Sequence, residues 1–159
     1  MMLNFSRDCG VFNVRTVGVL LHDGHVLLHR AEHEPFWTLP GGRIEFSEDA
    51  ATALVREVRE ELETDAHIQR LLWVVENFFV YNDNQCHELA FYFLLALEEN
   101  DRVYAQREFI GREEGCVLLF QWFPLSELDE LNVKPIFLKT GLLHLPESVA
   151  HVVQREMTE

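Results

Sequence analysis

The stretch REVREELET, residues 56–64, carries glutamates at a spacing that could bind a metal ion. On an α-helix, Glu57, Glu60 and Glu61 lie within an arc of about 100°, so their carboxylates share one face. Carboxylate oxygens are the ligands that Mg²⁺ and Mn²⁺ prefer in proteins. A charged helix face is more often simply solvated, and Arg56 and Arg59 could offset the repulsion among these carboxylates. The stretch by itself therefore leaves both interpretations open.

The helix that would carry these glutamates is predicted to begin near Ser47 and to run to about Glu63. Ser47 is a good N-cap, and Glu48 and Asp49 suit the first turn. The arc beside the glutamates is apolar and must face the core; it holds Ala51, Leu54, Val55, Val58 and Leu62.

The rest of the chain indicates an α+β fold with a mixed sheet. Val14–Leu21 and Val26–Arg30 flank Asp23-Gly24, which is a hairpin signal. Two long apolar segments, 67–81 and 86–97, are separated by a turn-like NDNQ and indicate a second antiparallel pair. Residues 98–115 are interpreted as an acidic loop and 116–124 as a short strand. Ser126 is predicted to cap a short helix, and segments 135–145 and 146–156 are predicted to be C-terminal helices.

Composition limits the partners of the protein. At 159 residues and 48% apolar content, the chain is predicted to form a single domain, residues 1–159. Its formal net charge of -14 would repel a long nucleic acid or an anionic membrane surface. A polyanionic substrate should therefore be small and should arrive with, or meet, a metal cation.

Cysteine usage and hydropathy predict a cytoplasmic location. Cys9, Cys86 and Cys116 are an odd number without a CxxC pair, as expected of free thiols in a reducing compartment. The first ten residues lack the apolar region of a signal peptide, and we expect no membrane span.

The full spacing around the glutamates is far more specific than the helix alone. From Gly42 the chain reads Gly, five residues, Glu48, seven residues, and then Arg56-Glu57-Val58-x-Glu60-Glu61. This pattern resembles the Nudix box, the signature of the Nudix hydrolase family. The preceding LPGG with Trp37, Glu45 and the later WFPLSEL segment extend the resemblance over most of residues 14–145.

The box departs from the family pattern at its end. Glu63 and Thr64 stand where the pattern has glycine and an aliphatic residue. That glycine normally ends the helix in a left-handed conformation, so a glutamate there should cost roughly 1 kcal/mol or push the turn onward to Asp65.

The resemblance implies a fold, a reaction and roles for single residues. It implies a Nudix fold, a mixed sheet packed between helices as an α/β/α sandwich, and cleavage of a nucleoside diphosphate linked to another moiety. Mg²⁺, or Mn²⁺ in its place, would be held by Glu57, Glu60 and Glu61, with the Gly41 carbonyl as an extra ligand. The catalytic residues implied are Glu57, Glu60 and Arg56, and of these Arg56 would orient the glutamates. The residues implied to support the loop before the helix are Gly42, Glu45 and Glu48.

The general base and the substrate contacts stay open. Glu57 is one candidate for the base, and a glutamate of the acidic loop, Glu108, Glu113 or Glu114, is the other. Arg30 resembles an arginine that often faces the phosphate in this family, but it could be an ordinary strand-end residue. Tyr81 stands where a tyrosine marks hydrolases of dinucleoside polyphosphates, although an aromatic residue in an aromatic-rich strand more often belongs to the core.

The expected function is therefore that of a Mg²⁺-dependent pyrophosphohydrolase acting on a nucleotide, a dinucleoside polyphosphate or a nucleotide sugar. The alternative is a non-catalytic Nudix-fold module that binds a nucleotide or a protein. Such modules usually lose box glutamates, and this chain keeps Glu57, Glu60 and Glu61, which favours the enzyme. We expect a small nucleotide-type substrate as partner and also allow for a homodimer.

Overall fold

One mixed β-sheet organises the protein in the computed structural model, which describes residues 1–113 and 115–157. Its strands follow the order β7-β8-β3-β2-β6-β5-β9, and β1 and β4 also pair with β2. The pairs β2/β6 and β5/β9 are parallel and the others are antiparallel. The strands are β1 (Asn4–Arg7), β2 (Gly10–His22), β3 (His25–Ala31), β4 (Gly41–Arg43), β5 (His67–Tyr81), β6 (Asn84–Ala96), β7 (Glu108–Glu113), β8 (Cys116–Pro124) and β9 (Ala150–Glu156).

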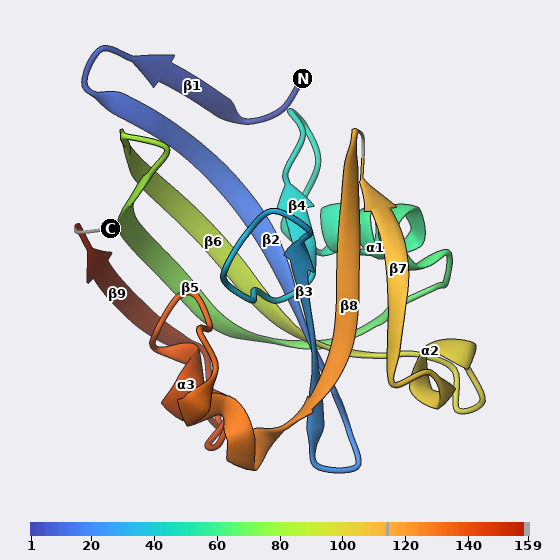
Figure 1. Cartoon of the computed structure of the whole chain (residues 1–159). Coiled ribbons are helices and arrows are strands. Elements are labelled where there is room, and N and C mark those ends of the chain that lie inside the picture. Colours follow the sequence, from blue (N-terminus) through green and yellow to red (C-terminus); the bar gives the residue numbers. More distant parts are fainter. Residues whose placement is uncertain (114, 158–159) are drawn as a thin grey trace.

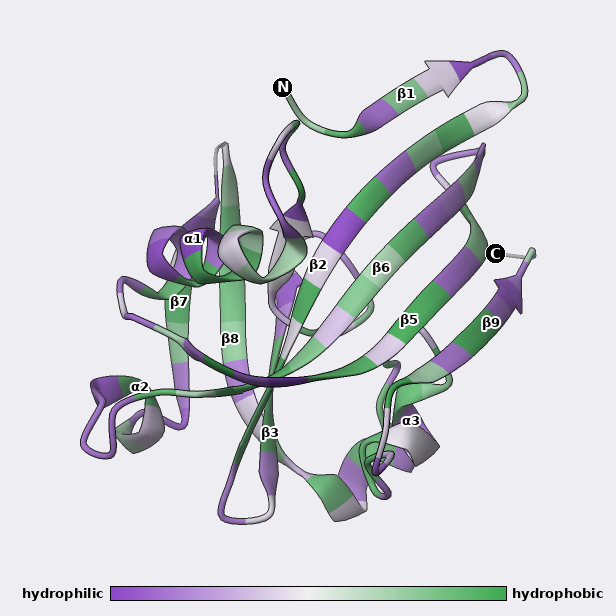
Figure 2. Ribbon diagram, turned by 180° about the vertical axis from the view of Figure 1, so that it is seen from behind, coloured by the Kyte–Doolittle hydropathy of each residue, from purple (hydrophilic) through white to green (hydrophobic). Residues whose placement is uncertain are grey.

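Helices cover both faces of this sheet, as the predicted α+β sandwich requires (Figures 1 and 2). The long helix α1 (Ala50–Leu62) lies on one face, where Leu54 and Val58 pack with Leu20 of β2. The one-turn helix α3 (Leu138–Gly141) and the 3₁₀ helix η1 (Leu125–Glu130) belong to the other face, where Leu138 packs with Val17. A further short helix, α2 (Arg102–Ala105), follows β6.

The two predicted hairpins are confirmed. β2 and β3 meet at Asp23-Gly24, and both residues have positive φ angles, 47° and 73°. β5 and β6 pair along their full length and turn at Asn82 and Asp83, with φ angles of 48° and 61°. Positive φ at both central residues is what a tight two-residue hairpin turn demands, and Asn, Asp and Gly tolerate it best.

Four predictions about the C-terminal half are wrong. Residues 150–156 form strand β9 rather than a helix, because their side chains alternate in exposure and β5 offers an edge for parallel pairing. The predicted helix over 135–145 shortens to α3. The supposed acidic loop contains α2 and β7, and η1 begins after Pro124 with no side-chain cap from Ser126.

The start of α1 also differs from the prediction. Asp49, and not Ser47, is the N-cap, since its carboxylate accepts hydrogen bonds from the Thr52 backbone N–H and hydroxyl. Ser47 instead has a φ angle of 66°. Glu48 therefore lies outside the first turn, where it is free to bind a side chain further along the helix.

The end of α1 explains how the departure from the box is tolerated. Glu63 itself takes the left-handed C-cap conformation, with φ 54° and ψ 37°, and its N–H bonds to the Arg59 carbonyl. The helix therefore ends at Glu63 and not at Asp65. The Asp65 carboxylate instead accepts two hydrogen bonds from the Arg59 side chain, at 2.9 and 2.6 Å.

Glu63→Gly is expected to stabilise the protein by about 1 kcal/mol, because glycine adopts this left-handed conformation without strain from a Cβ. The midpoint of urea unfolding should rise at unchanged slope. The control is Glu63→Ala, which removes the same carboxylate but keeps the Cβ. An equal gain from Glu63→Ala would show that charge, and not backbone conformation, is the cost.

Candidate metal and active site

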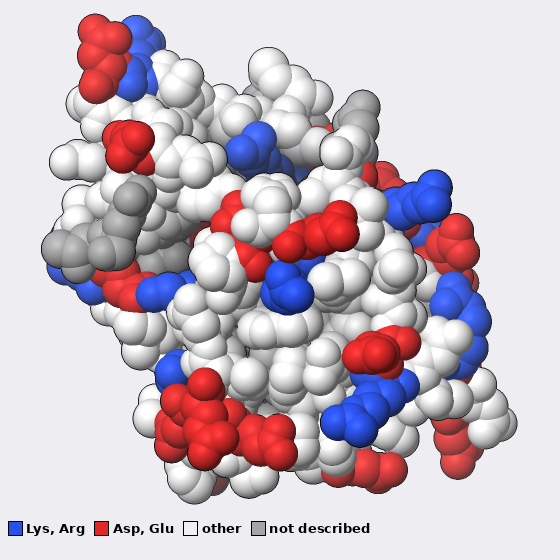
Figure 3. Space-filling model, in the orientation of Figure 1, with Lys and Arg blue, Asp and Glu red and all other residues white. Residues whose placement is uncertain are grey.

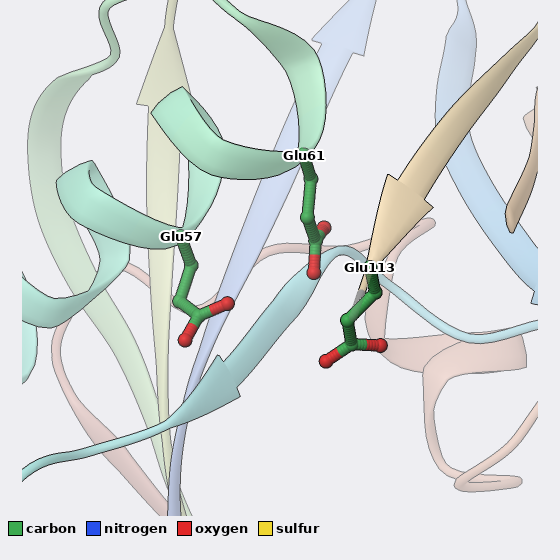
Figure 4. A group of neighbouring side chains, drawn as sticks. All are labelled: Glu57, Glu61 and Glu113. Carbon is green, nitrogen blue, oxygen red and sulfur yellow. The ribbon is translucent and has the colours of Figure 1, made fainter. Parts of the chain in front are cut away.

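Three carboxylates meet where α1 passes β7. Oxygen atoms of Glu57, Glu61 and Glu113 all lie within 4.8 Å of one another, and these residues are named here the glutamate cluster. Figure 4 shows the Glu57 and Glu61 side chains extending from successive turns of α1 toward Glu113 at the end of β7. Glu57 and Glu61 are buried, each 5% exposed, whereas Glu113 is exposed. The arrangement resembles a shell of hard oxygen ligands that is open to solvent on one side.

The electrostatics of the glutamate cluster call for a cation. Both carboxylate oxygens of Glu61 are buried and have no hydrogen-bond partner among the described residues. Burial, followed by the charges of Glu113 and Glu57, raises the pKa of Glu61 well above its ordinary value. Burial also raises the pKa of Glu57, although Arg56 opposes this shift. A divalent cation fits the site because it would satisfy the orphaned oxygens and neutralise the repulsion.

The two glycines of β4 are needed for different reasons. A Cβ on Gly42 would lie 2.2 Å from Glu57 Cδ and 2.4 Å from each of its carboxylate oxygens. A Cβ on Gly41 would instead lie 2.2 Å from the Thr16 carbonyl oxygen of β2. Gly42 is therefore needed for the Glu57 carboxylate, while Gly41 is needed for the pairing of β4 with β2. That the Gly41 carbonyl binds metal stays a prediction.

Arg56 links the loop before α1 to the glutamates. Its Nε and Nη2 donate to Glu48 at 2.9 and 3.2 Å, and its Nη1 donates to Glu57 at 2.8 Å. Nη1 also approaches Glu60 at 3.5 Å, and Nη2 donates to the Arg43 carbonyl at 3.2 Å. Such a fork between two carboxylates holds both in place. These contacts are the ones expected of an orienting arginine.

The loop residues contribute mainly through this network. Glu48 also accepts a hydrogen bond from the Glu45 backbone N–H at 3.4 Å. Glu45 is thus joined to the network through its main chain, and Glu48 ties both segments to Arg56.

Glu60 is not part of the glutamate cluster. Its side chain is 59% exposed, and its carboxylate lies 3.5 Å from Arg56 Nη1. That Glu60 also binds metal stays a prediction; its charge is near enough to contribute, after burial, to the raised pKa of both Glu57 and Glu61.

Of the three loop glutamates predicted as candidate bases, Glu113 alone is found beside Glu57 and Glu61 within the described residues. Glu108 begins β7, five residues earlier, and lies about 16 Å away along the strand. Glu114 lies outside the described residues.

The two predicted substrate-binding residues meet at the loop between β3 and β4. Arg30 donates to the carbonyls of Glu32 and Glu34, at 3.3 and 3.2 Å, and stacks over Trp37. The Tyr81 hydroxyl donates to the Glu34 carboxylate, and the Tyr81 side chain is exposed rather than part of the core. Contact of either residue with a substrate stays a prediction.

Arg15 is a charged residue that the sequence analysis missed. It lies two residues after Asn13 on the same face of β2, and its Nε is 3.8 Å from the Glu88 carboxylate. Burial alone would lower the pKa of Arg15, but nearby acids, chiefly Glu88 and then Tyr92, Glu61 and Glu113, raise it. The positive charge of Arg15 therefore interacts with both Glu88 and the glutamate cluster. Its signal in the sequence is an arginine within an otherwise apolar strand.

The raised pKa values of Glu57 and Glu61 predict how the metal-free protein responds to pH. The folded state binds protons more tightly than the unfolded chain, so stability should fall as pH rises above 4.5, the ordinary value of a glutamate. Glu61→Gln should flatten this decline and add about 1–3 kcal/mol at pH 8, because it removes a buried, unpaired charge.

Urea unfolding in EDTA at pH 5 and pH 8 measures this effect, with exposed Glu60→Gln as the matched control. Equal slopes with pH in wild type and Glu61→Gln would show that Glu61 does not titrate abnormally.

Comparison with known proteins agrees with the fold and the motif. The family model described as NUDIX domain matches residues 12–145. YjhB of Bacillus subtilis, a candidate ADP-ribose pyrophosphatase, is 35% identical over 60 residues, which cover 38% of this chain and 29% of YjhB. The low-salt glycan biosynthesis protein Agl8 of Haloferax volcanii is 34% identical over 90 residues, covering 52% of this chain and 58% of Agl8. The chain thus matches 29% of the length of YjhB and 58% of that of Agl8, which is less than two thirds of either relative.

Solved structures share the fold. The crystal structure of a UDP-X diphosphatase superposes with a TM-score of 0.58 at 19% identity, covering 88% of this chain and 66% of that chain. This likeness confirms the predicted α+β fold. Among the described residues, none of the helices is long and apolar enough to cross a bilayer.

Proposed function

Because this chain belongs to the NUDIX domain family, we propose that it is a hydrolase of phosphoanhydride bonds and that it uses a divalent metal to cleave a nucleoside diphosphate derivative. The observation that carries the proposal is the Glu61 carboxylate, buried with both oxygens unpartnered beside Glu57 and Glu113. A purely structural role would leave this charge uncompensated.

Glu57 and Glu61 would hold Mg²⁺, or Mn²⁺ in its place, with Glu113 beside them. When bound, the cation neutralises the diphosphate and activates the attacking water. Arg56 keeps the Glu57 carboxylate turned toward Glu61, and Gly42 leaves the space in which that carboxylate lies. The carboxylates that would bind the cation are thereby held in a fixed position on one side of the site.

Glu113 is our choice for the general base. It is exposed, so it can exchange a proton with water, and it lies beside the two buried glutamates. Glu57 is less suited, because its carboxylate already accepts a hydrogen bond from Arg56 at 2.8 Å.

The substrate is a small nucleotide with a further group on its diphosphate. Two relatives are named for ADP-ribose and UDP-X, which are molecules of this kind. The face drawn in Figure 3 has basic side chains scattered among acidic groups, and the net charge of -14 disfavours a long nucleic acid. Free Cys9, Cys86 and Cys116 support a cytoplasmic location.

The test is to incubate the protein with nucleoside triphosphates, a dinucleoside polyphosphate, ADP-ribose and a UDP-sugar, in Mg²⁺ or in EDTA. We expect turnover of at least one diphosphate derivative in Mg²⁺ and none in EDTA. Binding of a nucleotide without turnover of any substrate would instead support the non-catalytic module.

A further inference from the structure

Three polar side chains form a row across neighbouring strands on the sheet face opposite α1. Glu88 of β6 pairs in register with Asn13 of β2 on one side and with Asn77 of β5 on the other. All three are buried, with exposures of 7 to 8%. Neighbouring strands are about 4.8 Å apart, so this row, named here the acceptor row, spans about 10 Å.

The acceptor row offers hydrogen-bond acceptors that the protein itself does not use. The Oδ1 atoms of Asn13 and Asn77 are buried without a partner among the described residues. The Asn77 side chain is hydrogen-bonded to Glu88, which leaves the carbonyl oxygen of the amide to face elsewhere. Gln154 of β9 is the register partner of Asn77, but its side-chain oxygen already accepts a hydrogen bond from the Phe137 backbone N–H at 3.0 Å. A buried acceptor without a donor costs free energy, and a ligand that supplies the donor would recover that cost.

The acceptor row is connected to the glutamate cluster through Arg15. Arg15 lies two residues beyond Asn13 on the same face of β2, and its side chain is 31% exposed, so solvent reaches the row there. Arg15 also lies close enough to Glu61 and Glu113 to respond to their charges. On the other side, Tyr81 projects from the same face of β5 as Asn77 and contacts Glu34 of the β3–β4 loop.

We propose that the acceptor row binds the uncharged, hydroxyl-bearing sugar attached to the far side of the diphosphate. This inference rests on the proposed function and names the group that distinguishes the substrate. Sugar hydroxyls can each donate a hydrogen bond and are spread around a ring, which suits acceptors placed across three strands. The Glu88 carboxylate would repel a further phosphate, and the amide oxygens offer it no donor. A nucleobase edge carries at most a short run of adjacent donors, which is narrower than the row.

The test measures dissociation constants by calorimetry with Ca²⁺ in place of Mg²⁺, so that a cation neutralises the diphosphate, and chromatography of the sample verifies that no product forms. The probes are UDP-glucose against UDP, ADP-ribose against ADP, and GDP-mannose against GDP. In wild type, at least one sugar-linked member should bind about ten-fold tighter than its nucleoside diphosphate. Asn13→Ala and Asn77→Ala should each remove about five- to ten-fold of that advantage, corresponding to one lost hydrogen bond of about 1 kcal/mol. Binding of the plain nucleoside diphosphates should stay unchanged.

Gln154→Ala is the matched control, because it lies in the same register but already has its partner. Urea midpoints establish that each variant is folded. Three results would overturn the inference. The first is no tighter binding of any sugar-linked probe in wild type, and the second is a sugar advantage that survives both asparagine changes. The third is an equal loss of affinity for diphosphates with and without sugar, which would assign the row to the nucleobase. A retained sugar advantage with no turnover in Mg²⁺ would contradict the proposed function alone.

Discussion

Glu61→Gln is expected to lower kcat with saturating Mg²⁺ by about a hundred- to a thousand-fold. The change keeps the shape of the side chain but removes a charge from the centre of the glutamate cluster and puts N–H donors toward the cation. Glu57→Gln and Glu113→Gln should cause losses of similar size, since all three carboxylates lie within 4.8 Å of one another. Rates of phosphate-product release over a Mg²⁺ titration measure the effect, because a lost ligand should also raise the Mg²⁺ concentration needed.

Glu60→Gln and Glu108→Gln are the matched controls for this experiment. Glu60 is turned out of the glutamate cluster, and Glu108 is at the opposite end of β7 from Glu113. We expect each control to change kcat by less than about three-fold, in keeping with an exposed surface charge. A loss from Glu60→Gln as large as that from Glu61→Gln would place the metal on the outer face of α1 and refute our assignment.

Gly42→Ala should reduce kcat by about a hundred-fold while costing little stability. The new Cβ would overlap the Glu57 carboxylate, at 2.2 to 2.4 Å, so that carboxylate must swing away. The end of a flexible side chain moves at small cost, but Glu57 would then leave both Glu61 and Arg56. Kinetics as a function of Mg²⁺, together with urea unfolding, separate the two effects.

Gly41→Ala is the neighbouring control with the opposite profile. Its Cβ would meet main-chain atoms of β2, 2.2 Å from the Thr16 oxygen and 2.9 Å from the Val17 Cα, which cannot rotate aside. We expect a loss of about 1–3 kcal/mol in the free energy of unfolding. If Gly42→Ala lost stability instead and kept its kcat, the Glu57 carboxylate would not need the position seen here.

Local patterns in the sequence were sufficient for the features that depend on local physics. The hairpin turns at Asp23-Gly24 and Asn82-Asp83 follow from residues that tolerate positive φ. The spacing from Gly42 to Glu61 predicted both the helix and the glutamates on it. The Arg56 contacts with Glu48 and Glu57 follow from the same short stretch, because these residues are at most eight positions apart.

Only the tertiary structure decided which carboxylates meet. Glu113 comes within reach of Glu61 because β7 pairs with β8 beside α1, and no pattern local to residue 113 encodes that pairing. The direction in which α1 docks turns Glu61 inward and leaves Glu60 in solvent. The alignment of Asn13, Glu88 and Asn77 likewise exists only once three strands are in register. Such contacts join residues far apart in the chain, and they are selected by the burial of both sheet faces, which a single segment of sequence does not specify.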